Sequence, residues 1–545
     1  MKKSLLISLA FASTCMCQLD ARNLYVRLDG DTEAWTHISA DENNEVLTIT
    51  DGNFNGILGS ILTGDVVWVA KGVYTLTGSV NVNETRAGAK IYGGFYGTET
   101  SLEQRTLKDC DGNGIVEPWE FEHETRFVGN TDTDPSFRMF TLNAADDVLD
   151  GVTICDNTNV NDHGAGAYLK SGAILSRCII RNITSAADKD AAVNGTGVFV
   201  DGDGIIDACL IENCDNTNAN ASGSTYGGGV NISGEKSVIR NSVVRNNHVA
   251  AGKNALGAGV FLHNKATMEN CIVYNNSSDF RGGGVYIHNG GGKIYNATIV
   301  KNMGAKAGGG LFANGKSTVY NTVFWANVNE QGNANNINLN QAGSLESSAY
   351  CGEQGAGIWI EGKNSIKNPT LYAFIEKNDY TDEVTEGLAP RFIAPTEEAG
   401  IGYEFLEGTL EAIKTANWGL QSTSDLIDKG MNTVPDYTLA STDIRGNARP
   451  EGLSYDLGAC EYSKSSTNLQ VQPESASSYV IRTYSNGVRI DGIQTKAKVN
   501  LYNLQGALLK TLWLQNGETI AMYDNGTYLL SIEEESKTCS VKIVF

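Results

Sequence analysis

The chain has little proline and histidine, and it has fewer basic than acidic residues. Its 545 residues include 8 prolines and 6 histidines, and 41% of them are hydrophobic. This composition excludes a proline-rich or disordered chain and predicts a large globular protein with an ample core. Lys and Arg number 41 against 63 Asp and Glu, a formal net charge of -22 at pH 7. Because such a surface repels phosphate and anionic lipid headgroups, we expect no nucleic-acid partner.

Long apolar runs are also missing, apart from the first residues. Met1-Lys2-Lys3 is followed by an apolar stretch from Leu5 to Ala12 and then by small residues. This order is that of an export signal, which we place at residues 1–21. We expect no lipid anchor, because Thr14 precedes Cys15 and makes a poor lipoprotein cleavage site. No later run is long enough to span a bilayer, so we expect no transmembrane segment and a secreted or cell-surface protein.

Paired cysteine motifs are absent as well. The signal contains two of the 11 cysteines, so nine remain, without CxxC spacing or a His–Cys cluster. The odd number argues against a disulfide framework, and the spacing gives no indication of zinc. Cys178, Cys209 and Cys271 share one position of a repeat and are predicted to be buried, although Cys209 and Cys214 are near enough in sequence to pair.

The sequence is rich in glycine, with 61 residues, many of them in one recurring phrase. A glycine cluster followed by alternating apolar residues occurs six times, at residues 164–169, 195–200, 227–232, 257–262, 282–287 and 308–313. A degenerate seventh copy follows at residues 355–360. A period of about 30 residues is too short for a domain and is typical of a stacked solenoid.

A second column of small, apolar, apolar, polar and Asn residues runs in phase with the first. Its copies begin at Cys178, Cys209, Ser242, Cys271, Thr298 and Val323. Because side chains alternate along a strand, the small residue and the second apolar residue point inward, and Asn lies at the bend, where it tolerates a left-handed backbone. The two columns predict an all-β fold, a right-handed parallel β-helix of the pectin-lyase-like type.

Composition shifts divide the chain into four parts. We place the β-helix at residues 22–462, with regular coils at about 148–327 and an irregular polar excursion from 328 to 420. A polar linker follows at 463–478. Residues 479–545 alternate apolar and polar residues between Asn-Gly and Asp-Gly pairs, which are strong hairpin signals. We therefore expect a small C-terminal β-sandwich.

The sharpest chemical motif is the segment 109–120, which matches the calcium-loop pattern D-x-[DN]-x-[DN]-G-x5-E without a mismatch. Side-chain oxygens at its first, third and fifth positions converge on one hard cation, the seventh offers its carbonyl, and the twelfth is a bidentate carboxylate. The predicted Ca²⁺ site, which we interpret as structural, comprises Asp109, Asp111, Asn113, Ile115, Glu117 and Glu120. Pro118 suits the first turn of a short helix after the loop.

A cluster of charges surrounds a short apolar strand in residues 421–462. An open β-helix end exposes strand edges and must be covered, so we expect a cap held by arginine–carboxylate pairs, with Arg449 and Asp456 as the preferred pair. The predicted cap residues are Asp443, Arg445, Arg449, Asp456 and Glu461.

Several motifs resemble known families. Together with the glycine coils, residues 69–74 and 91–100 resemble secreted right-handed parallel β-helix repeat proteins of Bacteroidetes, also described as polymorphic outer-membrane-protein-like. Residues 427–430, 443–450 and 456–462 resemble the choice-of-anchor Q module, although Cys460 stands where an aromatic residue is usual. Residues 499–506 and 525–530 resemble a type IX secretion sorting domain. The resemblance implies export, anchoring through secretion machinery and surface display, and it implies no catalytic residue.

We therefore predict a non-catalytic, adhesin-like surface protein that binds a polysaccharide or another cell-surface partner. One alternative is a calcium-assisted polysaccharide lyase or glycoside hydrolase, which requires a basic residue and carboxylates in one groove on a coil face. Another is a purely structural surface protein. An exposed row of tyrosines would favour glycan binding over that alternative, and the candidates are Tyr226, Tyr274, Tyr286, Tyr295 and Tyr320.

Overall fold

The computed structural model divides the chain into two units, Met1–Ser463 and Lys464–Phe545. Within the first it describes residues 21–83, 86–132, 136–159, 163–186, 193–217, 223–250, 254–339, 344–346, 348–351, 358–360, 371–374, 390–400 and 409–463. Within the second it describes residues 480–484, 487–491, 493–503, 508–516, 518–521, 527–534 and 537–544. Nearly all of the predicted signal and the predicted linker lie outside these residues. No helix of the described part is long and apolar enough to span a membrane.

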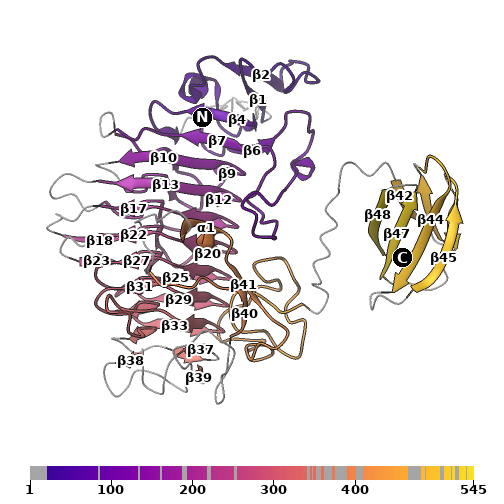
Figure 1. The fold of residues 1–545 in the computed structure, drawn as a ribbon. Coiled ribbons are helices and arrows are strands. Elements are labelled where there is room, and N and C mark those ends of the chain that lie inside the picture. Colours follow the sequence, from indigo (N-terminus) through magenta and orange to yellow (C-terminus); the bar gives the residue numbers. More distant parts are fainter. Residues whose placement is uncertain are drawn as a thin grey trace, which may run out of the picture. The chain divides into compact units, whose positions relative to one another are not determined.

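Three parallel sheets, named A, B and C here, stack coil upon coil to form the first unit (Figure 1). Between residues 66 and 360, each coil contributes a strand to A, then to B, then to C. Sheet A contains, in spatial order, β2 (Asn44–Ile49), β1 (Asn23–Leu28), β3 (Val66–Ala70), β6 (Lys90–Phe95), β9 (Val148–Asp150), β12 (Ile174–Ser176), β15 (Ile205–Asp207), β20 (Val238–Arg240), β25 (Ala266–Glu269), β29 (Gly292–Tyr295), β33 (Ser317–Tyr320) and β36 (Ser344–Glu346).

Sheet B forms the face on which the candidate site lies. Its main strands are β4 (Gly72–Thr75), β7 (Thr125–Val128), β10 (Thr153–Asn159), β13 (Ile179–Ser185), β16 (Leu210–Glu212), β21 (Val243–Arg245), β26 (Ile272–Tyr274), β30 (Thr298–Val300), β34 (Val323–Trp325), β37 (Ser348–Cys351) and β39 (Leu371–Phe374). Beyond a bend the sheet continues through β17 (Asp215–Asn216), β22 (His248–Val249), β27 (Ser277–Ser278) and β31 (Met303–Gly304).

Sheet C closes each coil. It contains β5 (Val80–Val82), β8 (Phe140–Leu142), β11 (Ala167–Lys170), β14 (Val198–Asp201), β19 (Val230–Ser233), β24 (Val260–His263), β28 (Val285–Ile287), β32 (Leu311–Ala313), β35 (Ile337–Leu339) and β38 (Ile358–Ile360). The short pair β18 (Ser224–Tyr226) and β23 (Asn254–Leu256) lies outside the three sheets, and two 3-10 helices, η1 (Phe54–Ser60) and η2 (Leu102–Gln104), interrupt the first coils. The solenoid thus begins at β1 and continues to β39, within the predicted range 22–462. Its coils extend beyond residue 327, where we expected the regular repeat to give way to an irregular excursion.

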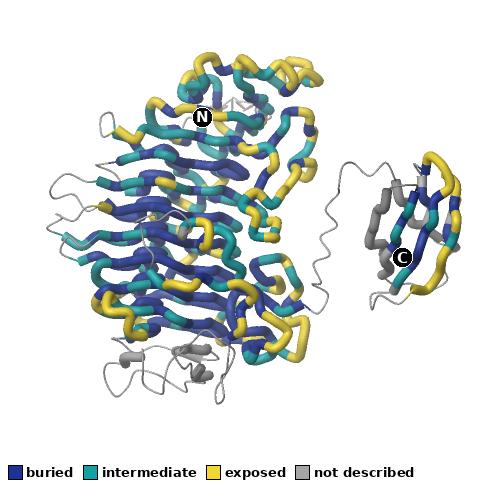
Figure 2. The backbone as a smooth tube through the Cα atoms, viewed as in Figure 1, coloured by how far each residue is buried: buried dark blue, intermediate teal, exposed yellow. Residues whose placement is uncertain are grey.

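The interior follows the predicted alternation. Ile180, Ile211, Val244 and Val273 occupy one inward column of sheet B, and all are fully buried. Figure 2 shows the same pattern as buried segments along the strands and exposed ones in the loops. The cysteines at 155, 178, 209, 214, 271 and 460 are buried and free, which confirms the predicted stack and excludes a Cys209–Cys214 bond.

A ladder of buried asparagines follows the bend of sheet B. The Nδ2 of Asn276 donates to Oδ1 of Asn302 at 2.9 Å, and Asn302 donates in the same way to Asn327 at 3.0 Å. The last glycine of four repeat phrases, at positions 229, 259, 284 and 310, packs against this ladder. A Cβ on Gly284 would lie 2.8 Å from Nδ2 of Asn302, so glycine is required there by close approach.

Residues 390–400 and 409–463, named the lateral cover here, pack on the outer faces of sheets A and B. They contain β40 (Phe392–Ala394), α1 (Thr409–Lys414) and β41 (Asn417–Leu420). Trp418 contacts Tyr274, with ring centroids 5.4 Å apart, and Tyr437 stacks on Tyr295 at 4.1 Å. The predicted cap therefore covers the side of the coils rather than their open end.

The cap residues do not form the predicted set of ion pairs. Arg449 pairs with Glu461 at 3.3 Å, not with Asp456, and its Nη2 donates to the carbonyl of Gly458. Arg445 donates to Asn417, which is a side-chain amide. Asp443, Asp456 and Glu461 instead accept hydrogen bonds from backbone amides, for example Asp443 from the amides of residues 445, 447 and 461. The five predicted cap residues thus form one ion pair with one another and many contacts to backbone amides, because the turns of the cover bring backbone donors to the carboxylates.

The second unit has two antiparallel sheets, as predicted. One contains β42 (Val480–Tyr484), β43 (Gly487–Asp491) and β46 (Thr519–Ala521). The other contains β45 (Leu508–Leu514), β44 (Ala497–Asn503), β47 (Thr527–Glu534) and β48 (Lys537–Val544). Buried residues of both sheets form one cluster, among them Ile490, Ile520, Val499 and Ile532.

Candidate ligand groove and metal-binding loop

The segment 109–120 folds as a closed loop between η2 and β7. An antiparallel bridge joins Leu107 to Phe121, and the amide of Lys108 donates to the carbonyl of Glu120 at 3.0 Å. Gly112 and Gly114 have φ of 76° and 79°, the left-handed conformation that the sharp turn requires. The predicted short helix at Pro118 does not form.

The loop brings three of the six predicted ligands together. Carboxylate oxygens of Asp109, Asp111 and Glu120 lie within 4.8 Å of one another. The backbone orients them, since Asp109 accepts from the amides of Gly112 and Gly114. Glu120 accepts from the amides of residues 110, 111 and 117. Three clustered carboxylates with free lone pairs are the donor set that Ca²⁺ prefers, so these residues fit the ion.

The remaining predicted ligands have other contacts. Oδ1 of Asn113 accepts from the Ile115 amide at 2.7 Å, and its Nδ2 donates to Oε1 of Glu117 at 2.8 Å. The other oxygen of Glu117 is buried with no hydrogen-bond partner. Burial and the nearby Glu120 raise the pKa of Glu117 to about 9. Burial also raises the pKa of Asp111, to about 6, although Arg245 opposes the shift.

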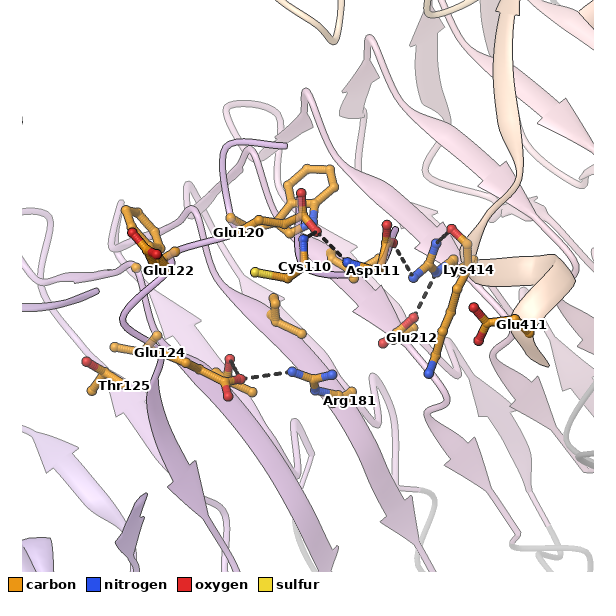
Figure 3. Close-up of a pocket in the computed structure, with 18 residues that line it drawn as sticks. Cys110, Asp111, Glu120, Glu122, Glu124, Thr125, Arg181, Glu212, Glu411 and Lys414 are labelled. Atoms are coloured by element: carbon orange, nitrogen blue, oxygen red, sulfur yellow. Dashed lines mark hydrogen bonds and ion pairs between the residues drawn. The ribbon is translucent and has the colours of Figure 1, made fainter. Parts of the chain in front are cut away.

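Beside the loop, a cavity of about 510 Å³ opens on the outer face of sheet B, named the sheet B groove here (Figure 3). The loop contributes Asp111, Trp119 and Glu120 to one wall. Its floor contains outward apolar residues of β13 and β16, Ile179 and Leu210. The groove therefore combines an apolar floor with a polar rim, an arrangement common in small-molecule and sugar sites.

Glu124 and Arg181 form the central polar contact of the groove. Nη2 of Arg181 donates to Oε1 of Glu124 at 2.9 Å, and the Thr153 hydroxyl donates to the same oxygen at 2.7 Å. Both charged side chains are partly exposed, with 32% and 44% of their surface accessible. They can therefore exchange their mutual contact for one to a ligand.

Arg245 connects the other wall to the sheet. Its Nε donates to the buried carboxylate of Glu212 at 2.8 Å, and its Nη1 donates to the Tyr274 hydroxyl at 3.0 Å. Nη1 also contacts the carbonyl of Lys414 at 3.2 Å, at the end of α1. Although burial alone would lower the pKa of Arg245, Tyr274 and Glu212 raise it well above its ordinary value. Burial would raise the pKa of Glu212, but Arg245 outweighs this and lowers it.

The predicted tyrosine row is not an exposed face. Tyr274, Tyr286, Tyr295 and Tyr320 are buried, and Tyr226 is half-buried. Tyr286 lies in a stack between Phe261 and Phe312, with centroids 5.3 and 5.2 Å away. The other three buried tyrosines lie beneath the lateral cover, which no local pattern in the sequence predicts.

Sequence reasoning missed the residues of the sheet B groove, although one signal was available. Arg181, Glu212 and Arg245 occupy the polar fourth position of the second repeat column, and the register aligns them on neighbouring strands. Three charges of alternating sign stacked on one outer face indicate a patch, because parallel coils place like positions above one another.

Comparison with known proteins agrees with these coils. The family model of the right handed beta helix region matches residues 139–324. The solenoid is a right-handed parallel β-helix. Among solved structures, the chain is similar to that of "pectate lyase Pel9A" at 12% identity, covering 82% of this chain and 98% of that chain with a TM-score of 0.34. So loose a likeness carries no argument about activity. No curated protein sequence matches the chain.

Proposed function

We propose that the protein is exported and binds a glycan in the sheet B groove without converting it. The observation that carries this proposal is the groove itself, with Ile179 and Leu210 on its floor and Glu124 and Arg181 at its centre. Sugars present apolar faces and hydroxyl edges, which match such a surface. Binding here does not need the tyrosine row.

We also propose that Ca²⁺ binds the loop through Asp109, Asp111 and Glu120. Asp111 and Glu120 line the groove as well, so the ion would stiffen one wall. The support is the convergence of three carboxylates oriented by backbone amides. When bound, the ion supplies electrostatic neutralisation and rigidity, and we assign it no other task.

The test of glycan binding is calorimetric titration of the full exported chain with a panel of oligosaccharides in calcium buffer. Ile179→Arg places a long charged side chain on the groove floor and is expected to abolish binding. Ile205→Arg is the matched control, because Ile205 is an outward, half-buried isoleucine on sheet A, outside the groove. Equal loss in both variants, or no binding by the unmodified protein, would contradict the proposal.

A second candidate is a glycoside hydrolase or polysaccharide lyase. It is favoured by one observation: the groove gathers the carboxylates of Glu124 and Glu411 with the basic groups of Arg181 and Lys414. Mass spectrometry of products after incubation separates the candidates. Hydrolysis adds one water per bond cleaved, so the masses of the products sum to that of the substrate plus one water. Elimination adds no water and leaves an unsaturated end on one product. Products that disappear with Glu124→Gln but persist with the exposed control Glu235→Gln would replace the binding proposal.

The export signal and the second unit support a surface location, in which the second unit engages secretion or anchoring machinery. Its double antiparallel sheet is compatible with the resemblance to sorting domains. Deleting residues 464–545 in an expressing bacterium of the Bacteroidetes type should move the first unit from the cell surface to the periplasm. Unchanged surface display would contradict this role.

A further inference from the structure

We infer that the sheet B groove accepts a glycan without acidic groups and discriminates against uronate and sulfated polymers. The inference rests on the proposed function and goes further, because it names the charge class of the ligand from the charges that line the groove.

Acidic side chains outnumber basic ones around the groove. The carboxylates belong to Asp111, Glu120, Glu122, Glu124, Glu212 and Glu411. The bases are Arg181, Arg245 and Lys414. The lining thus has an excess of three negative charges when all are ionised, and with Asp109 and one Ca²⁺ in the loop included the excess is two.

Two of the three bases are already engaged by protein groups. Arg245 is nearly fully buried in its contacts with Glu212 and the carbonyls of α1, so it cannot turn toward a ligand. Arg181 is bound to Glu124, so an acidic ligand that took over this arginine would leave the Glu124 carboxylate without its ion pair beside the ligand's own negative charge. Of the three bases, only Lys414 forms no ion pair with the described residues. Figure 3 places it beside the carboxylates of Glu212 and Glu411, whose negative charges offset its positive charge.

The carboxylates at the rim are less well neutralised. Glu411 forms no ion pair with the described part of the chain, and Glu122 reaches Lys108 at 4.0 Å with both side chains largely exposed. A uronate ring would bring its negative charge into this field, within a chain whose formal net charge is -22. A neutral ring meets no such repulsion, and an amino sugar would gain pairs with Glu122 or Glu411.

Three matched ligands test the inference: β-1,4-linked hexamers of glucose, glucosamine and glucuronic acid, which share one backbone geometry. Each is titrated calorimetrically into the full exported chain, with calcium and with a chelator. We expect the glucosamine and glucose hexamers to bind, and the glucuronic acid hexamer to bind at least about tenfold more weakly in both buffers. Raising the salt concentration should narrow the difference, because screening weakens the repulsion.

The double variant Glu122→Gln/Glu411→Gln should reduce the ratio of the affinities for the neutral and the acidic hexamer by several-fold. Glu330→Gln, an exposed carboxylate that does not line the groove, should leave it unchanged. A glucuronic acid hexamer that binds as tightly as the others, or tightly with calcium alone, would overturn the inference while leaving the groove as a glycan site. Binding by none of the three would overturn the proposed function and this inference with it.

Discussion

Nη2 of Arg245 lies 3.6 Å from Oδ2 of Asp111, so a residue on strand β21 contacts the predicted metal loop directly. The two residues are far apart in the sequence, and the same guanidinium also binds Glu212 and the end of α1. Arg245 thus links both walls of the groove to its floor. The arrangement explains how an insertion and a distant helix can form one site on a regular solenoid.

The first prediction concerns this link. Arg245→Ala removes the cation paired with the buried Glu212 carboxylate and is expected to lower the free energy of unfolding by about 3–5 kcal/mol. Arg240→Ala is the control, because Arg240 pairs with Asp207 at an exposed position and should cost less than about 1 kcal/mol. Chemical denaturation measures both. Equal costs would show that the Arg245 network is not stabilising.

The second prediction separates the metal ligands from their neighbours. Asp109→Asn removes one of the three convergent carboxylates, so calorimetry should show Ca²⁺ affinity falling by at least about tenfold. Glu117→Gln should retain binding, because the Glu117 carboxylate contacts Asn113 and is not part of the convergent group. Loss of binding in Glu117→Gln alone would reverse this assignment.

The third prediction tests the asparagine ladder. Asn302→Ala removes an amide that donates to Asn327 and to the carbonyls of Val273 and Val300. Because these buried groups lose their partner without gaining water, unfolding free energy should fall by about 2–4 kcal/mol. Asn314→Ala removes an exposed side-chain amide that donates to Asn289, and it should lower the free energy of unfolding by less than about 1 kcal/mol. Similar midpoints of thermal unfolding for the two variants would contradict the claim that the buried asparagine ladder stabilises the fold.

The fourth prediction concerns pH. Burial alone would lower the pKa of His248, but hydrogen bonds to Asp215 at 2.9 Å and Asp279 at 3.3 Å outweigh it and raise the pKa from 6.5 to about 9. The native state therefore holds a proton that the unfolded chain has lost between these two values. The contribution of His248 to the free energy of unfolding is therefore fully present below about pH 6.5, and this contribution of roughly 3 kcal/mol is lost as pH rises through about 9.

Denaturation curves recorded across this pH window check the fourth prediction. His248→Gln removes the titrating group, so its stability should change little between the same limits. If the unmodified protein and the variant show the same pH dependence, other groups dominate the titration.

Much of the solenoid could be predicted from the sequence, because each coil repeats the same local contacts. The glycine phrase and the inward column at Ile180 and Ile211 both follow from sterics that act within one coil or between neighbours. For the two copies of the second column that begin at Thr298 and Val323, the predicted alignment with the earlier copies is wrong by one residue. Thr298 pairs with Ile272 rather than aligning with Cys271, and Lys301 and Ala326 take the left-handed position expected for Asn. Two adjacent asparagine positions at each bend made the alignment ambiguous there.

The site could be predicted only in part. The loop 109–120 is local, so its pattern indicated the convergent carboxylates. The groove depends on contacts between distant segments, such as Arg245 with the end of α1 and Tyr274 with Trp418. Outward residues on a solenoid carry no local signal of what will cover them, which is why the tyrosines predicted to be exposed are buried.

The most direct test of the central claim is hydrogen exchange by mass spectrometry on the full chain, with and without its best-binding oligosaccharide in calcium buffer. A ligand in the sheet B groove should slow exchange in peptides spanning residues 108–125, 179–181 and 409–415, and leave sheet C unchanged. Protection confined to sheet C, or to the second unit, would place the ligand elsewhere and contradict the account.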